Sequence, residues 1–180
     1  MADMWIAPEI DPRERLEQGS GEKATATAYL EAYRMTLEMK CSGLDAEQMA
    51  RRAVPPSRLS LLGMVRHLAR VEHRWFRCVL GGSPTTPQIH DDGDAGFADV
   101  SASDAAVAAA WASWGAEVAH ARTLWSDFAE DRLGEEFRVG GPGTGTVTAR
   151  DLLVHMVEEY ARHMGHVDLL RECIDGRTGQ

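Results

Sequence analysis

The sequence predicts an all-α domain built as a four-helix bundle, and three observations lead to this fold class. Four stretches of roughly 17 to 26 residues place apolar side chains at helical intervals, and these lengths suit bundle helices. No run of alternating apolar and polar residues gives a confident strand. With 180 residues, 44% of them hydrophobic, the chain can bury one core without disulfides, so residues 1–180 are expected to form a single domain.

The first part of the chain is expected to be an arm followed by a helix. Residues 1–21 mix proline, glycine and charge without a period, which predicts an N-terminal arm laid over the domain. The first helix is expected to begin near Glu22, because apolar residues recur at helical intervals through residues 24–40, and Gly43 then stops it. Residues 54–57, with two consecutive prolines, form a connector.

The second helix is predicted to open at Ser60, a good N-cap, and to end at Gly81 and Gly82. One of its faces is apolar and consists of Leu61, Met64, Val65, Leu68, Val71, Trp75 and Val79. Residues 81–102 hold prolines, glycines and aspartates without a period, a connection long enough to run the full length of a bundle. Such a connection lets helices two and three run parallel, which gives an up-down-down-up order.

The third and fourth helices complete the predicted bundle. The third is expected over residues 103–128, and its tryptophans are interpreted as core or pocket wall. Residues 133–147 are glycine-rich and are interpreted as a loop, with a short extended piece as the alternative. Thr148 and Asp151 resemble a capping box, so the fourth helix is expected to begin there and to continue to about Cys173, before Gly176.

Composition excludes several classes of function. Cys41, Cys78 and Cys173 are far apart and in no CxxC spacing, which indicates neither disulfides nor a cysteine zinc site and favours a reducing cytoplasm. The net charge of −9 is spread along the chain without a basic stripe, so nucleic acid is a poor partner. No signal-peptide pattern and no run of about 18 apolar residues is present, so we expect a soluble protein without a membrane partner.

The fourth helix carries charged and titratable residues on its apolar face. On a helical wheel centred on Met156, His163 lies about 20° and Glu159 about 60° from the centre of the apolar stripe. Burying an ionised carboxylate without a partner is costly, and a bound cation would satisfy both side chains, which are four residues apart. A hydrogen-bonded core histidine and an arginine partner for Glu159 are the alternative. The run His155, Glu159, His163 and His166, at spacings of four, four and three, favours metal.

Two residues do not complete a site, because catalytic zinc centres take three protein ligands and keep a position open. His67 borders the apolar stripe of the second helix and is the best third candidate. His73 points to an arginine-rich side and is expected to be solvated, while His90 and His120 have no partner at ligand spacing. Glu72 falls inside the stripe, where it is a fourth ligand, a partner of a ligating histidine, or paired with an arginine.

Two segments resemble a known family. Residues 61–76 read LLGMVRHLARVEHRWF and residues 155–166 read HMVEEYARHMGH, and both resemble the actinobacterial, mycothiol S-transferase-like branch of the DinB superfamily. The resemblance includes residues 55–57 and 168–172 and extends over most of the chain. It implies the DinB four-helix bundle and a metal held by His67, Glu159 and His163. The middle Glu159 is similar to the His/Glu/His arrangement of mycothiol-dependent maleylpyruvate isomerase.

The resemblance also implies thiol-dependent transferase chemistry. A divalent metal, zinc in our interpretation with nickel or another ion as the alternative, would hold mycothiol as a thiolate that attacks a small electrophile. His166 or His155 would transfer protons; Met164-Gly165-His166 departs from the Arg-Gly-Gln of relatives, so the role of His166 stays open. The alternatives are a mycothiol-dependent isomerase and a non-catalytic metal-binding stress or interaction protein. The partners are then a low-molecular-weight thiol and a small electrophile, in a monomer or homodimer.

Overall fold

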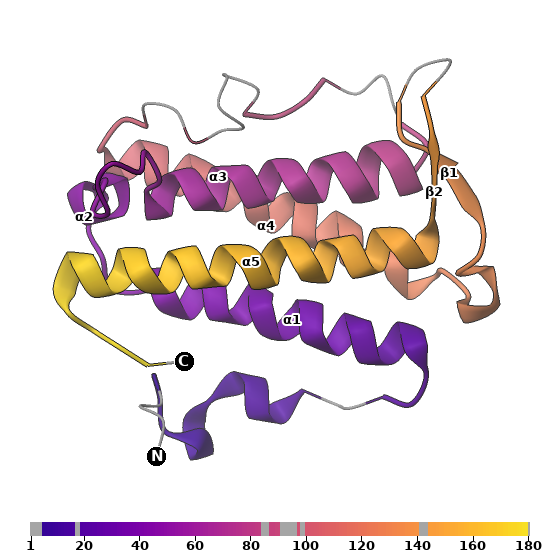
Figure 1. Ribbon diagram of the computed structural model, residues 1–180, viewed down its shortest axis with the longest axis horizontal. Helices are drawn as coiled ribbons and strands as arrows, with labels where there is room; N and C mark the ends of the chain where they lie inside the picture. Colours follow the sequence, from indigo (N-terminus) through magenta and orange to yellow (C-terminus); the bar gives the residue numbers. More distant parts are fainter. Residues whose placement is uncertain are drawn as a thin grey trace.

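Long helices lie side by side in the computed structural model, which describes residues 5–16, 19–83, 87–90, 97, 100–140 and 144–179 (Figure 1). They are α1 (Glu22–Cys41), α3 (Leu61–Glu72), α4 (Asp104–Ser126) and α5 (Ala149–Asp175), and α3 continues without a break as a π-helix over His73–Leu80. The short helix α2 (Ala46–Ala50) lies between α1 and α3, and 3₁₀ turns occupy Pro8–Ile10, Pro12–Arg15 and Glu130–Arg132. The predicted all-α fold class is confirmed.

The predicted helix ends agree with the structure because their capping residues make the expected bonds. The Ser60 hydroxyl accepts from the backbone N–H of Gly63 and begins α3, and Ser103 caps α4 in the same way. Thr148 and Asp151 form the predicted capping box of α5. Gly176 ends α5 in the left-handed conformation, with φ of 78°.

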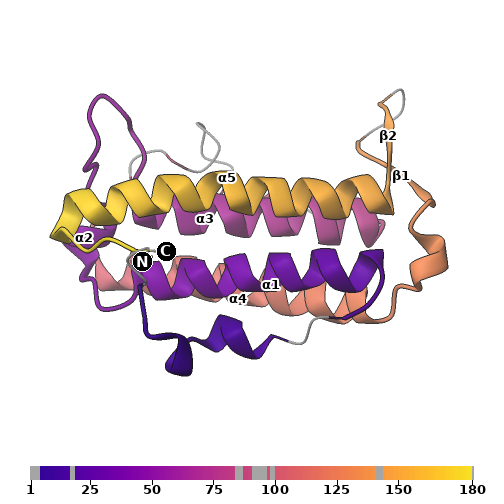
Figure 2. The ribbon, with the colours of Figure 1, turned by 60° about the horizontal axis from the view of Figure 1, so that its bottom comes forward.

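The directions of the helices follow from contacts at their ends. Arg150, at the start of α5, donates to Glu22 at the start of α1, and Arg171 near the end of α5 donates to the Lys40 carbonyl near the end of α1. Lys23 of α1 instead donates to the Phe128 carbonyl just beyond the end of α4. Helices α1 and α5 therefore run one way, while α4, and α3 beside it, run the other way (Figures 1 and 2).

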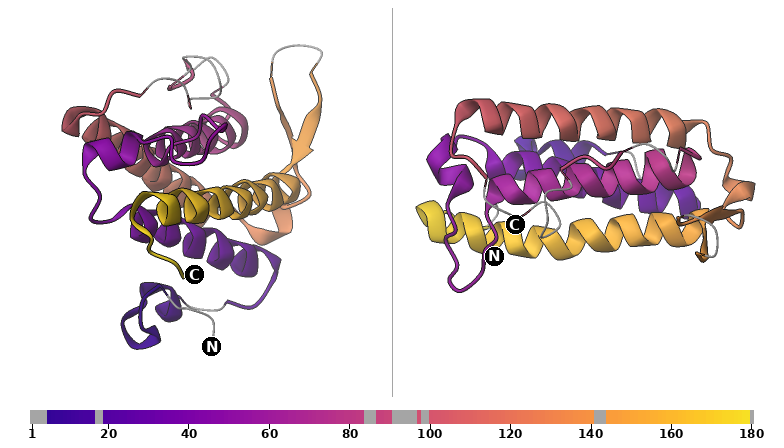
Figure 3. Two further views of the ribbon diagram at one scale, coloured as in Figure 1. Left: turned by 60° about the vertical axis from the view of Figure 1, so that its left-hand side comes forward. Right: turned by 90° about the horizontal axis from the view of Figure 1, so that it is seen from above.

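Two regions differ from the sequence prediction. The region 133–147 was interpreted as a loop, with a short extended piece as the alternative, and it contains an antiparallel hairpin of β1 (Glu136–Arg138) and β2 (Thr146–Thr148), whose second strand leads directly into α5 (Figure 3). Gly140 and Gly145 lie between the two strands, and residues 141–143 are outside the described residues. Helix α2 was not predicted at all, although Asp45 and Gln48 form a capping box before it.

Helix α3 is covered on two sides, and this explains one wrong prediction. It lies between α4 and α5, so its buried surface is wider than the single stripe that the wheel suggested (Figure 3). His73 was expected to be solvated, but it is buried, with Nδ1 3.4 Å from Glu117 Oε2 of α4. Arg77 donates to the same carboxylate. The side of this helix that carries His73 and Arg77 is therefore part of the interface with α4, not a solvent-facing surface.

The core contains most of the predicted apolar residues. Trp114 and Trp125 of α4 are buried, and Trp111 packs edge-to-face on Trp114 at 5.4 Å between ring centroids. The tryptophans of α4 thus belong to the core, as interpreted. The side chain of Trp5 in the N-terminal segment is also buried, with the Arg177 guanidinium 3.6 Å from its ring centroid. Among the described residues, no helix combines the length and apolar character that crossing a bilayer requires.

Candidate metal centre

His67 of α3 and Glu159 and His163 of α5 meet at the interface of the two helices. Oε2 of Glu159 lies 3.2 Å from Nε2 of His163 and 3.6 Å from Nε2 of His67. One potential ligand atom from each of the three residues lies within 4.8 Å of the other two. The spacing of four residues places Glu159 and His163 on the same side of α5. The three residues singled out from the sequence are therefore brought together by the fold.

The spacing of the donor atoms fits a small divalent ion. In a tetrahedral zinc site with bonds of about 2.1 Å, neighbouring donors lie about 3.4 Å apart. The separations of 3.2 and 3.6 Å from Oε2 of Glu159 fall on either side of that value. Two imidazoles and one carboxylate are also a donor set found in catalytic zinc centres, which leave a further position open. His67, Glu159 and His163 thus fit the divalent metal ion that the resemblance implies.

The electrostatics of the cluster keep Glu159 ionised. A hydrogen bond from His163, followed by one from His67, holds the pKa of Glu159 well below its usual value of 4.5, although partial burial acts in the opposite direction. Histidines are the only side chains that form ion pairs with Glu159 among the described residues. The carboxylate is therefore negatively charged at neutral pH, as a metal ligand must be.

His155 contacts the second oxygen of Glu159. Its Nε2 lies 3.4 Å from Oε1, the atom that does not face His67 and His163. The ring of Trp75 packs edge-on against His155, with centroids 4.6 Å apart. His155 has a side-chain exposure of 33%, compared with 10% for His163. It therefore lies at the solvent-facing border of the cluster and approaches Oε1, while Oε2 faces His67 and His163.

His166 lies behind His163 rather than in the cluster. The Nδ1 atoms of the two rings are 3.3 Å apart, so the ring nitrogen of His163 that does not face Glu159 faces His166. Burial, together with the charges of His163 and Arg162, lowers the pKa of His166. A neutral His166 can accept a hydrogen bond from Nδ1–H of His163. When an ion replaces the hydrogen bond from Nε2 of His163 to Glu159, that bond would keep the remaining ring proton on Nδ1 and leave Nε2 available to the ion.

Phe97 covers the two histidines and was not singled out from the sequence. Its ring stacks on that of His67 with a centroid distance of 4.5 Å, and it lies 6.1 Å from the ring of His163. Gly63, one turn before His67 on α3, adjoins Phe97, because a Cβ there would lie 3.4 Å from Cα of Phe97 and 3.2 Å from Oγ of Ser60. Phe97 comes from the long aperiodic connection, so no periodic pattern could have assigned it to the site.

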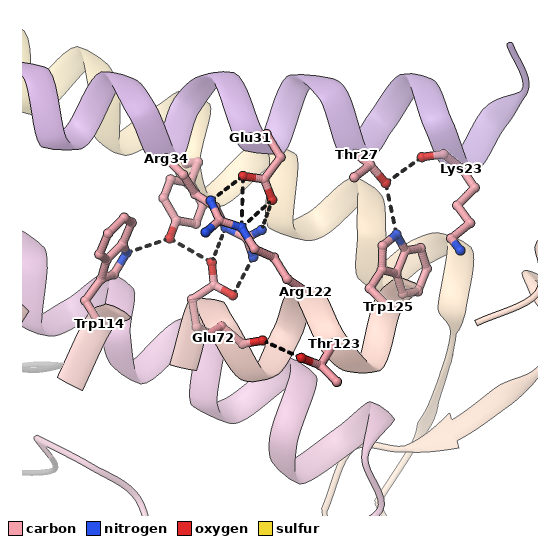
Figure 4. Close-up of polar contacts among 11 residues, drawn as sticks. Lys23, Thr27, Glu31, Arg34, Glu72, Trp114, Arg122, Thr123 and Trp125 are labelled. Atoms are coloured by element: carbon pink, nitrogen blue, oxygen red, sulfur yellow. Dashed lines mark hydrogen bonds and ion pairs between the residues drawn. The ribbon is translucent and has the colours of Figure 1, made fainter. Parts of the chain in front are cut away.

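Glu72 does not belong to the cluster, which settles the alternatives left open by the sequence. Both of its oxygens accept hydrogen bonds from Arg34 of α1, at 2.9 and 2.7 Å, and the side chain is fully buried (Figure 4). Glu72 is thus the partner of an arginine rather than a fourth ligand. Arg34 had not been identified from the sequence, because the helical wheel of one helix carries no information about its partners on another.

A hollow adjoins the exposed border of the cluster. It has a volume of about 440 Å³ and is lined by Arg70, Val71, Arg74, Trp75 and Gln88. Trp75 is shared between this hollow and the contact with His155. The hollow is therefore linked to Glu159 through Trp75, which lines it, and His155, which contacts both Trp75 and Glu159. Its volume falls in the range of small-molecule sites.

Comparisons with known proteins show the family of the chain and its fold. A family model described as mycothiol-S-transferase matches residues 25–176. The crystal structure of a conserved protein from Enterococcus faecalis is similar with a TM-score of 0.65 at 15% identity, over 88% of this chain and 99% of that one. At this identity the likeness shows the fold alone. No curated protein matches the chain. Because the family model covers well over half of the sequence, the chain belongs to the mycothiol-S-transferase family.

Proposed function

We propose that the chain is a metal-dependent S-transferase that joins mycothiol to a small electrophile. The observation that carries the proposal is the convergence of His67, Glu159 and His163 at the donor spacing of a small divalent ion. The match to the mycothiol-S-transferase family supports the choice of thiol and of reaction. The donor set suits zinc best, while nickel or another divalent ion could occupy the same ligands.

The ion would supply one element of the chemistry. When bound by these three residues, it would lower the pKa of a thiol at its open position and keep the sulfur nucleophilic at neutral pH. A free thiol with a pKa near 8.5 is only a few per cent ionised at about pH 7. The increase in the reactive fraction is therefore on the order of tens of times, equivalent to about 2 kcal/mol.

The surrounding residues would orient the ligands and keep out water. His166 fixes the ring of His163 through the contact between their Nδ1 atoms, and His155 fixes the carboxylate of Glu159 through Oε1. Phe97 covers the face of His67, which reduces access of water to that side. These contacts would hold the donors in place before the ion binds, and such partners commonly set metal affinity.

His155 is the residue that we propose to carry the proton of the thiol. It is adjacent to the ligand Glu159 and is more exposed than His67, Glu159 and His163, so it can exchange protons with solvent. An imidazole has an ordinary pKa near 6.5, which suits proton transfer at about neutral pH. His166 faces the rear of His163 and is better suited to positioning than to proton transfer.

The hollow beside Trp75 is the proposed site for the electrophile. Trp75 lines it, and the same ring packs on His155, which contacts Glu159. The indole provides an apolar wall, and Arg70 and Arg74 add positive charge to the lining. A small molecule bound there would approach the ligand cluster past His155.

The reaction can be tested with a fluorogenic alkylating agent such as monobromobimane and purified mycothiol. We expect the zinc-loaded protein to accelerate formation of the thioether, the chelator-stripped protein to lose the acceleration, and added zinc to restore it. His163→Ala should be inactive, whereas His120→Ala, a histidine replacement on α4, should retain activity. Equal rates for the loaded, stripped and His163→Ala proteins would exclude the proposal. A product of unchanged mass from an unsaturated test acid would indicate an isomerase instead.

A further inference from the structure

A buried polar network joins all four long helices beside the candidate metal centre. The Tyr160 hydroxyl of α5 donates to Oε1 of Glu72 on α3 at 2.7 Å, and Nε1 of Trp114 on α4 donates to the Tyr160 oxygen at 2.9 Å. Arg34 of α1 donates to both oxygens of Glu72 (Figure 4). These four residues, Arg34, Glu72, Trp114 and Tyr160, are called the buried network below.

The charges of the buried network are balanced at its outer edge. Nη1 of Arg34 donates to Glu31 at 2.7 Å, and Arg122 of α4 binds the Glu31 carboxylate with a shortest distance of 2.6 Å (Figure 4). Glu72 and Tyr160 are fully buried and Arg34 is almost so. Burial, followed by the charge of Glu72, raises the pKa of Tyr160, so the phenol stays a hydrogen-bond donor. Each polar group of the buried network therefore donates or accepts a hydrogen bond with a named partner.

Two members of the network are close in sequence to the candidate ligands. Tyr160 directly follows Glu159 and comes three residues before His163 on α5. Glu72 comes five residues after His67 on α3, which is about 7.5 Å along a helix axis. The bond between Tyr160 and Glu72 thus crosses the same α3–α5 interface as the contacts of His67 with Glu159, within two helical turns of them.

Such a network is better suited to fixing geometry than to adding stability. Replacement of a buried ion pair by well-packed apolar residues is often neutral or stabilising, because the charges must be removed from water. Apolar contacts are non-directional, and a core tolerates repacking before it loses stability. A hydrogen bond from a phenol to a carboxylate, in contrast, requires a particular distance and angle.

We propose that the buried network is a positioning device that fixes α5 against α3 and thereby sets the spacing of the donors of His67, Glu159 and His163. This inference rests on the proposed binding of an ion by those residues. A slip of α5 by one residue would move Glu159 by about 1.5 Å along the axis. Metal–ligand distances tolerate deviations of only about 0.2 Å. The same slip would break the bond of Tyr160 to Glu72, so the network opposes it.

The test is a titration of the metal-free protein with Co²⁺, which reports both affinity and coordination geometry through its visible absorption. Tyr160→Phe removes one hydroxyl and keeps the ring. We expect it to weaken Co²⁺ binding by about tenfold and to alter the absorption bands, as removal of residues supporting a metal site commonly does. Leu170→Val, a core substitution on the same helix, is the matched control and should bind Co²⁺ like the parent. Measurements are made well below the melting temperature of every variant.

A second variant separates positioning from folding. Arg34→Met, Glu72→Leu, Trp114→Phe and Tyr160→Phe together replace the polar groups of all four members by apolar ones, so that no buried member is left without its partner, and this quadruple variant is expected to remain folded while binding Co²⁺ at least tenfold more weakly. Parent-like affinity in both network variants would overturn the inference and leave the proposed function intact. Equal losses in Tyr160→Phe and Leu170→Val would also overturn it. Absence of Co²⁺ binding by the parent would remove the proposed function itself.

Discussion

His163 is contacted on both of its ring nitrogens: Nε2 lies 3.2 Å from Glu159, and Nδ1 lies 3.3 Å from Nδ1 of His166. A hydrogen bond from Nδ1–H of His163 to Nδ1 of His166 would fix the orientation of the ring that directs Nε2 toward Glu159. The run of titratable residues on α5, which consists of His155, Glu159, His163 and His166, therefore contains residues with different roles. Glu159 and His163 face His67, whereas His155 and His166 support these two residues from outside.

Removal of His166 should weaken metal binding without removing a ligand. We predict that His166→Ala lowers the affinity for Zn²⁺ by about tenfold, because His163 loses the acceptor that orients it. His166→Gln, whose carbonyl oxygen can accept the same hydrogen bond, should recover part of the affinity. Competition titrations with a chromogenic chelator measure the difference. A His166→Ala protein with unchanged affinity would show that the Nδ1 contact has no such role.

Removal of the Phe97 ring should make a bound ion easier to extract. Phe97 stacks on His67, and the apolar groups around a metal site control the access of water. We predict that Phe97→Ala increases several-fold the rate at which a chelator removes zinc. Phe137→Ala, which alters an aromatic residue of the hairpin, is the control and should leave that rate unchanged. A slower or equal rate in Phe97→Ala would contradict the assignment of Phe97 as a cover.

The cysteines of the chain should not provide the nucleophile. Burial raises the pKa of Cys41 to about 12 and also raises that of Cys78, whereas Cys173 is exposed. We predict that a thiol reagent at about pH 8 modifies one cysteine rapidly in the folded protein and that Cys173→Ser abolishes this phase. The S-transferase activity of Cys173→Ser should equal that of the parent. Loss of activity in Cys173→Ser would mean that a protein thiol takes part.

The stability of the fold should depend on pH through Glu31. Burial acts to raise the pKa of Glu31, but the hydrogen bond of Arg122 and the charges of Arg34 and Arg122 outweigh it, and the net pKa lies below the ordinary 4.5. The folded state thus binds this proton less readily than the unfolded state. The stabilisation is present above about pH 4.5 and is lost as the pH falls through the folded pKa.

Glu31→Gln removes this titration. We predict that its melting temperature falls less steeply with decreasing pH below about pH 4.5 than that of the parent. The exposed Glu172→Gln should keep the parent slope. The check is thermal unfolding followed by circular dichroism between about pH 3 and pH 7. Parallel slopes for parent and Glu31→Gln would show that the ion pairs of Glu31 do not contribute in this range.

Local signals in the sequence were sufficient for the long helices but not for their partners. Ser60, Ser103 and the pair Thr148 and Asp151 mark helix starts, because a cap acts on the backbone within one turn. The capping box of α2 is equally local and was overlooked. The hairpin strands are only three residues each and carry no alternation long enough to be recognised.

Contacts between helices could be predicted only where titratable side chains on an apolar face required a partner. The spacing of Glu159 and His163 required a partner, and His67 was the best histidine on another helix; the fold brings these three together. The partner of Glu72 could not be derived, because Arg34 lies on α1 and has no spacing relation to it. The prediction that His73 is solvated was wrong for the same reason, because a helical wheel of α3 cannot show that α4 places Glu117 beside it.

The most direct test of the central claim is the metal content of the purified protein, measured by inductively coupled plasma mass spectrometry beside His163→Ala and His120→Ala. Our account predicts close to one divalent ion per chain in the parent and in His120→Ala, and almost none in His163→Ala. Equal metal content in all three proteins, or none in the parent after incubation with zinc, would contradict it.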